Sequence, residues 1–221
     1  PGEAVELLKP YAEAGRDVVC IAISDVFSTT GNVLRMTADA INEEAGRTQV
    51  HVINSANLST GIGLLVLEAA TMAREGMEAE QIVKNIEALV PKVRASFVVD
   101  TLTYLHRGGR CSGLAALAGG ALKLHPQIVV KDGKMDVAKK FRGNMKKVLL
   151  EYTKELTDAL MHAKKNRVFI THSGCDKETV DAIHEYVSGL NVFEEILETT
   201  AGGVISSHCG PGTLGVLFIE E

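Results

Sequence analysis

Apolar residues come in short blocks along the first part of the chain, and these blocks predict strands and helices in alternation. Residues 18–23 form a continuous apolar run, which is typical of a strand buried on both faces. A second strand is expected at 49–53, and helices are expected at 30–45, 60–75 and 78–89. The order strand, helix, strand, helix is typical of a parallel sheet with right-handed crossovers.

The rhythm changes around Pro91. A strand at 96–100 precedes a Gly-rich stretch, and an Asp-Gly turn within 127–137 predicts a hairpin. The remaining expected elements are a long helix at 143–165, a strand at 167–171, a helix at 177–189, and strands at 193–199 and 215–219. The sequence therefore predicts an α/β protein of two domains. Residues 1–93 would form a parallel α/β domain, and residues 94–221 an α+β domain with a mixed or antiparallel sheet.

Composition narrows the function classes. With 46% hydrophobic and 23% charged residues, the chain is expected to fold rather than remain disordered. A net charge of -5 and the absence of Trp argue against nucleic acid as a partner. The four cysteines form no C-x-x-C pair, and neither a secretory signal nor a membrane-length apolar run is present. These features favour a reducing cytoplasm and no stable membrane insertion.

Hydroxyl and carboxyl side chains gather where the first strand gives way to a helix. The segment contains Ser24, Asp25, Ser28 and Thr30. In open α/β sheets ligands bind at the carboxyl ends of strands, and a helix N-terminus favours an anionic group. Simple helix capping by Ser or Thr is the alternative.

A second candidate motif, Arg107-Gly-Gly-Arg110, follows the strand at 96–100. Paired glycines allow a close backbone approach, and Arg110 can hold a carboxylate or phosphate. The alternative is a tight turn with a solvated arginine. The chain contains no G-x-x-x-x-G-K-[ST] sequence, which excludes a P-loop.

The most specific stretch surrounds His208. Hydroxyl residues precede this histidine, and a Gly-Pro-Gly turn, Gly210 to Gly212, follows it in what is expected to be a loop. We interpret it as part of a site rather than as a structural loop. The histidines show no metal-binding spacing, so no metal site is expected. His172 and Cys175 lie at a strand end and are not expected to form a dyad.

Basic residues cluster locally despite the acidic total. Lys139, Lys140 and Arg142 precede two further lysines at 146 and 147. The cluster is either a solvated surface or a docking surface for an acidic partner.

Taken together, these segments resemble the DegV family of bacterial fatty-acid-binding proteins. The resemblance is collinear over essentially the whole chain. It is carried by the following segments: Ile23-Ser24 with Ser28-Thr29-Thr30, Leu105-His-Arg-Gly-Gly-Arg110, Leu122-Lys-Leu-His-Pro126, Asp132-Gly-Lys with Lys140-Phe-Arg142, and His208-Cys-Gly-Pro-Gly-Thr213-Leu-Gly215.

The resemblance implies a long-chain fatty acid in a tunnel between the domains and no cofactor. It also implies that the chain presents the fatty-acid carboxylate to a separate ATP-binding kinase subunit, which makes an acyl phosphate for phospholipid synthesis. On that view the chain is no enzyme and has no catalytic nucleophile of its own. The tail would dominate affinity, since each buried CH₂ contributes roughly 0.8 kcal/mol.

The family resemblance also implies residue roles. Lipid-binding residues would be Ser24, Asp25, Ser28, Thr30, Arg110, His208, Gly210 and Gly212. Partner-binding residues would be Arg142, Lys139 and Lys140. The small residues Ala115 to Gly120 and the helix around Leu64–Leu67, apolar on all sides and expected to be buried, would form tunnel wall.

The sequence departs from the family pattern in two places. Pro1-Gly2-Glu3 read as a helix start, and the family's preceding segment, with its first strand and a carboxylate-binding Thr, is expected to have been lost upstream. In the ligand loop, Asp25 replaces a usual Ser, Thr29 a usual Gly, and Gly31 a common aromatic. An ionised Asp25 would repel a fatty-acid carboxylate unless one of the two is protonated or Asp25 points away.

Three alternatives to the fatty-acid carrier stay open. The first is a carrier of the same fold for another lipid or amphiphile, motivated by Asp25. The second is a hydrolase that uses His208 with Ser206, Ser207 or Cys209. The third is a partner-binding module with an empty tunnel.

Overall fold

The computed structural model describes residues 2–110 and 124–221. It has an α/β fold with a parallel two-stranded sheet and a mixed six-stranded sheet, which confirms the predicted fold class. The chain divides into two compact units. The first contains residues up to Leu58 together with Ile62–Pro91 and Asp132–Lys134, and the second contains the rest of the described chain. The boundary at 93/94 between folding domains stays a prediction.

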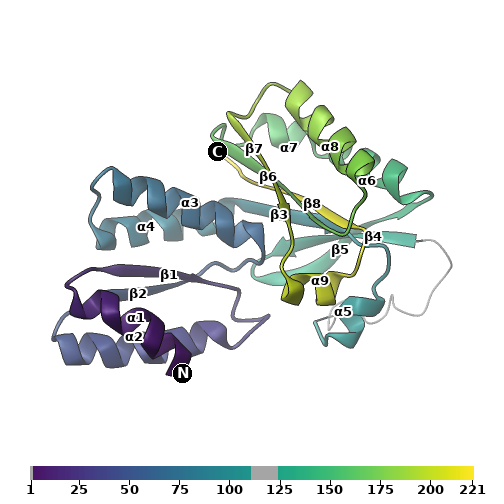
Figure 1. Cartoon of the computed structure of the whole chain (residues 1–221). Coiled ribbons are helices and arrows are strands. Elements are labelled where there is room, and N and C mark those ends of the chain that lie inside the picture. Colours follow the sequence, from purple (N-terminus) through teal and green to yellow (C-terminus); the bar gives the residue numbers. More distant parts are fainter. Residues whose placement is uncertain (1, 111–123) are drawn as a thin grey trace. The chain divides into compact units, whose positions relative to one another are not determined.

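The first unit has three layers. Its elements are α1 (Gly2–Glu13), β1 (Val18–Ala22), α2 (Thr30–Ala45), β2 (Val50–Asn54), α3 (Thr60–Arg74) and α4 (Ala79–Leu89). Strands β1 and β2 pair in parallel, as expected, in a register that sets Val18 opposite Val50. Helices α1 and α2 lie on one side of this sheet and α3 and α4 on the other (Figure 1).

Apolar spacing in the sequence explains this packing. Leu8 and Ala12, one turn apart on α1, are buried with Ala38 and Ile41 of α2 against Val50. Burying a Leu, Ile or Val side chain contributes about 1.5–3 kcal/mol, so this packing stabilises the helices against the sheet. Helix α2 stops at Gly46, which adopts a left-handed conformation with φ of 67°.

The outer edge of β1 pairs with no other strand of the described chain. Val19 and Ile21 on this edge line an apolar hollow of about 390 Å³ together with small residues of α3. Val66 of α3 borders the same hollow and is 45% exposed. The expectation of a fully buried helix around Leu64–Leu67 is therefore wrong at Val66, although Leu64 and Leu65 are buried.

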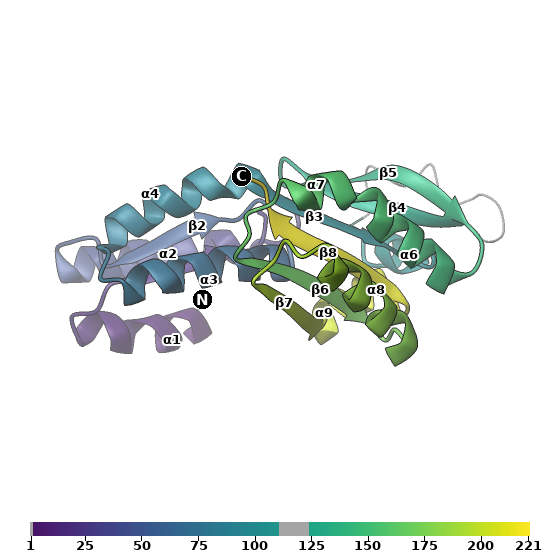
Figure 2. The ribbon, with the colours of Figure 1, turned by 90° about the horizontal axis from the view of Figure 1, so that it is seen from above.

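The second unit is built on the six-stranded sheet. Its elements are β3 (Val93–Val98), α5 (Thr103–Arg107), β4 (Leu124–Lys131), β5 (Lys134–Arg142), α6 (Met145–Glu155), α7 (Thr157–Met161), β6 (Arg167–Ser173), α8 (Lys177–Gly189), β7 (Glu195–Thr200), α9 (Gly203–Cys209) and β8 (Thr213–Ile219). The strand order is β5-β4-β3-β8-β6-β7, and only β6 and β7 are shown to pair in parallel. Helices α6 and α8 lie along the same side of this sheet (Figure 2).

A tyrosine lies at the centre of this core. The Tyr152 side chain on α6 is fully buried, and its hydroxyl donates to the Ser96 carbonyl at 2.8 Å. The same oxygen accepts from the Val216 N–H at 3.0 Å and lies 2.9 Å from the Ser96 hydroxyl. Because its one hydrogen and both lone pairs are engaged, the hydroxyl joins β3, β8 and α6. Burial raises the pKa of Tyr152 to about 12.

Three local expectations are wrong. The long helix at 143–165 is two helices, α6 and α7, which meet at Leu156. The Thr153 and Thr157 hydroxyls donate to the carbonyls of Leu149 and Lys154, and such side-chain bonds compete with regular helix bonding. The stretch around His208 was expected to be a loop, but residues 203–209 form helix α9. The sequence also predicted no helix at α5, which is only five residues long.

Replacing Tyr152 with Phe tests the hydroxyl hub. Tyr152→Phe leaves the Val216 N–H and the Ser96 hydroxyl without their buried partner, which is expected to lower the free energy of unfolding by about 1–3 kcal/mol. Tyr186→Phe is the control, because the Tyr186 hydroxyl bonds a single hydroxyl, that of Thr157, among the described residues, and Tyr186 is half-buried. Denaturant unfolding measures both variants. Equal losses would show that the hub contributes nothing special.

Candidate functional site

Ser24 shapes the loop between β1 and α2. Its hydroxyl donates to the Gly133 carbonyl at 2.7 Å and accepts from the Val26 N–H at 3.3 Å. Its backbone carbonyl accepts from the N–H groups of Phe27 and Ser28. Ser24 is buried, and its hydroxyl hydrogen is already donated. The residue therefore fixes the conformation of the loop.

Ser28 and Thr30 offer a free hydroxyl donor in this loop. Their hydroxyl oxygens lie 2.8 Å apart, and the Thr30 N–H donates to the Ser28 hydroxyl at 3.2 Å. One hydroxyl donates to the other, so one O–H hydrogen of the pair stays available in the described structure. Both side chains lie at the start of α2 and are at least partly exposed. The arrangement can donate a hydrogen bond to an anionic group.

Asp25 is paired with a cation. The Arg35 guanidinium donates through Nη2 to Asp25 Oδ1 at 2.9 Å and to Asn32 Oδ1 at 2.5 Å. A Cβ atom at Gly31 would lie only 2.3 Å from Asp25 Oδ1, so a side chain there would displace the carboxylate. The missing side chain at Gly31 therefore makes room for the Asp25–Arg35 ion pair.

The Arg107–Arg110 motif and the His208 stretch come together within the second unit. A Cβ atom at Gly108 would lie 1.9 Å from His208 Nδ1, so only glycine allows the imidazole to approach this backbone. Arg110 donates through Nη1 to the Gly108 carbonyl at 2.7 Å. Gly108 thus brings the two candidate motifs into contact. The helices that carry them, α5 and α9, lie side by side (Figure 1).

The two glycines of the Gly-Pro-Gly turn, Gly210 and Gly212, are needed for different reasons. Gly210 has φ of 81°, and a Cβ atom there would lie 2.3 Å from the Tyr104 ring. Gly212 has φ of 76° with open space around it, and its N–H donates to the Ser173 carbonyl at 2.7 Å. The turn therefore fixes α9, and with it His208, against Tyr104 of α5.

The hydroxyls and the thiol beside His208 are engaged elsewhere. Ser206 donates to the Ala201 carbonyl at 2.9 Å and Ser207 to the Val204 carbonyl at 2.8 Å. Burial raises the pKa of the Cys209 thiol, which disfavours the nucleophilic thiolate. His208 Nδ1 is buried without a hydrogen-bond partner in the described residues. No nucleophile in the described part of the chain is hydrogen-bonded to this histidine, so the geometry lends the hydrolase hypothesis no support.

The basic cluster on β5 divides between the two faces of the strand. Lys139 pairs with Glu155 and lies over the Phe141 ring, 4.6 Å from its centroid. Lys140 and Arg142 are exposed and point to the opposite face, because neighbouring residues alternate along a strand. Lys139 is thus partly neutralised, whereas the other two are available to a partner.

Three contributing residues were missed from the sequence. None of the three, Arg35, Asn32 and Tyr104, belongs to a recognisable motif. Arg35 bonds Asp25 and Asn32, and Tyr104 packs against Gly210. Gly31 and Arg35 are four residues, or one helical turn, apart. This spacing could have indicated that the Arg35 side chain lies over Gly31. Ala115–Gly120, Leu122 and Lys123 lie outside the described residues.

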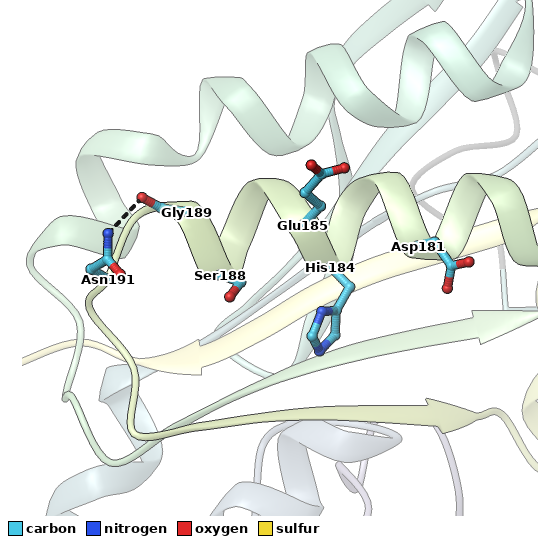
Figure 3. Close-up of a pocket in the computed structure, with 6 residues that line it drawn as sticks. All are labelled: Asp181, His184, Glu185, Ser188, Gly189 and Asn191. Carbon is cyan, nitrogen blue, oxygen red and sulfur yellow. Dashed lines mark hydrogen bonds between the residues drawn. The ribbon is translucent and has the colours of Figure 1, made fainter.

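A second hollow, of about 550 Å³, lies along the C-terminal half of α8 (Figure 3). Its lining is polar and comprises Asp181, His184, Glu185, Ser188, Gly189 and Asn191. His184 points from α8 toward the neighbouring strands, whereas Glu185 points the opposite way. Such a surface does not suit an acyl chain, which needs apolar walls. The described residues include no cluster of His, Cys, Asp or Glu that could hold a metal ion, and no helix in them is long and apolar enough to span a membrane.

The two-sheet α/β fold places this chain in a class of α/β proteins with many similar sequences and solved structures. A family model described as "Uncharacterised protein, DegV family" matches residues 1–221, and the chain belongs to the DegV family. A DegV domain-containing protein of Caldanaerobacter subterraneus subsp. tengcongensis is 31% identical over 226 residues, covering 100% of this chain and 77% of that protein. A relative from Deinococcus radiodurans is 31% identical over 218 residues, covering 98% and 74%.

Solved structures share the fold. A DegV family protein from Thermus thermophilus, described by its fatty acid binding, matches with a TM-score of 0.88 and 31% identity over 100% of this chain and 77% of that chain. A stearic acid-binding protein from Eubacterium ventriosum matches with a TM-score of 0.82 and 26% identity over 98% and 75%. The family resemblance inferred from the sequence is thereby confirmed.

Two glycine substitutions separate backbone strain from loss of space. Gly212→Ala introduces only an unfavourable positive φ, whereas Gly210→Ala adds a clash with the Tyr104 ring. We expect Gly210→Ala to lower the free energy of unfolding by about 1–3 kcal/mol more than Gly212→Ala does. Denaturant unfolding of both variants checks this, and equal values would contradict the packing of α9 on Tyr104.

Proposed function

We propose that this chain binds a long-chain fatty acid and presents its carboxylate to a separate ATP-binding kinase subunit. The observation that carries the first part is the match to the Thermus thermophilus fatty-acid-binding DegV protein over the whole chain. Further support comes from the Eubacterium ventriosum stearic acid-binding protein, which shares the fold at 26% identity. On this proposal the protein is a carrier and needs no cofactor or metal.

The proposed head-group contacts fall into two roles. Ser28 and Thr30 supply the hydroxyl hydrogen that can be donated to a carboxylate, and His208 with Arg110 supplies the remaining polar atoms. The other residues hold these donors in place, namely Ser24, Asp25, Gly210 and Gly212. Support for this division comes from their hydrogen bonds, since Ser24 has already donated its hydrogen and the glycines position α9.

The acyl tail supplies most of the affinity in this proposal. Each buried CH₂ contributes roughly 0.8 kcal/mol, so a long tail contributes several times the energy of one hydrogen bond to a charged carboxylate, which is about 1.5–3 kcal/mol. A head-group hydroxyl therefore contributes more to the orientation of the ligand than to its affinity. This division of labour is common in small-molecule sites, where few polar groups fix the orientation.

The kinase would dock on the exposed cations of β5, Lys140 and Arg142, with Lys139 contributing less because of its bond to Glu155. An acidic kinase surface would complement them. The product would be an acyl phosphate, which phospholipid synthesis consumes. An ATP-dependent partner places this reaction in the cytoplasm.

Denaturing extraction of the purified protein, followed by mass spectrometry of the released small molecules, tests the carrier proposal. We expect a long-chain fatty acid at about one molecule per chain. The paired variant Ser28→Ala/Thr30→Val should bind added palmitate at least about tenfold more weakly, because the hydroxyl donor proposed to bond the charged carboxylate is gone. Thr157→Val, which removes a hydroxyl in the second unit bonded to Tyr186, serves as the control.

A different lipid in the extract would replace the fatty acid in this proposal. An empty protein that also fails to bind added palmitate would reject it.

A further inference from the structure

The Asp25–Arg35 ion pair lies inside the proposed head-group loop. Asp25 follows Ser24 directly and precedes the Ser28–Thr30 hydroxyl pair by one short turn. The side chains of Asp25 and Arg35 are each 36% exposed, so solvent screens the pair only in part. A ligand carboxylate bound at this loop would therefore meet the charge of Asp25 as well as the hydroxyl donors.

Two carboxylates in one site oppose each other's ionisation and binding. Arg35 counters this, because its guanidinium carries a permanent positive charge and bonds directly to Asp25 Oδ1. Asn32 holds the same nitrogen, Nη2, at 2.5 Å, so the guanidinium is fixed from two sides. The hydrogen bonds of Arg35 in the described part of the chain all use Nη2, so its Nε–H and Nη1–H groups remain available as donors.

Gly31 makes this arrangement possible. An ideal Cβ there would lie 2.3 Å from Asp25 Oδ1 and 3.3 Å from Arg35 Nη1. Both charged groups thus occupy the space above the first turn of α2 that a side chain at position 31 would take. Asp25, Arg35, Gly31 and Asn32 thus form one cluster of contacts within the first unit.

We infer that Arg35 is a positioning residue that determines the charge of the head group this loop accepts. By neutralising Asp25, Arg35 allows a long-chain carboxylate to bind where an isolated Asp25 would favour an uncharged amphiphile. This inference rests on the proposed fatty-acid binding and adds a residue to it. It also resolves the conflict between Asp25 and a carboxylate ligand without requiring either group to be protonated.

A charge cycle with two ligands tests the inference. The variants are Arg35→Met, Asp25→Ser and the double variant, and the ligands are palmitate and hexadecanol, which have the same acyl length but differ in head-group charge. Arg35→Met is expected to weaken palmitate binding about tenfold through the unmasked charge of Asp25, and to change hexadecanol binding by less than about twofold. The double variant is expected to recover palmitate affinity to within about twofold of the unmodified chain.

Gly31→Ala provides a second route to the same result. It keeps both charges but displaces the Asp25 carboxylate from Arg35, so it should weaken palmitate selectively. Arg47→Met is the matched control, because Arg47 also pairs with an aspartate, Asp17, but outside the loop. Arg47→Met should change the affinity for neither ligand.

The outcomes separate the two claims. Equal weakening of both ligands by Arg35→Met, or no rescue in the double variant, would show a structural role only and would overturn the inference while fatty-acid binding stands. Unchanged palmitate binding in Arg35→Met would overturn it as well. If the unmodified chain binds neither ligand, the proposed function fails first and the inference fails with it.

Discussion

The candidate motifs of each unit depend on space that missing side chains provide. At Gly31, Gly108 and Gly210 the backbone leaves room for Asp25, the His208 imidazole and the Tyr104 ring respectively, each within 2.3 Å of where a Cβ atom would stand. Protein interiors are close-packed, so a single added methyl group at such a position must displace its neighbour. Close contact with glycine backbone thus limits where Asp25, His208 and Tyr104 can lie.

Close approach of side chains to glycine backbone has a different result in each unit. In the first unit it brings an acid and a base together, so that the loop carries little net charge and keeps a hydroxyl donor free. In the second unit it seats His208 beside Gly108, whose carbonyl accepts a bond from Arg110. The hydroxyls beside His208 bond to the backbone carbonyls of Ala201 and Val204, so the surroundings of this histidine do not favour nucleophilic chemistry.

Much of the fold could be predicted from the sequence, since blocks of apolar residues and turn signals are local features. The strand at 18–23, the helix at 30–45 with its glycine stop, and the Asp-Gly hairpin all follow such features and are present. The break at Leu156 was not predictable from periodicity, because it arises from threonine hydroxyls that bond to helix carbonyls. Helices α5 and α9 are too short to show a helical period.

The site was predictable in its motifs and not in its contacts. Ser24 and His208 were identified by their position and neighbours, but the engagement of the Ser24 hydroxyl by Gly133 depends on a residue far along the chain. Arg35 carries no motif and becomes meaningful only through its bond to Asp25. Residues that matter through a tertiary contact were missed, whereas the site residues proposed from the sequence are those with a local pattern, and they stay a prediction.

The central claim is that a long apolar tail dominates ligand binding while the polar loops orient the head group. Calorimetric titration of the delipidated protein with saturated fatty acids of increasing length tests this most directly. The account predicts that affinity rises by about two- to fourfold for each added CH₂ up to a long-chain limit, because each group leaves water. An affinity that does not change between short and long acids would contradict it.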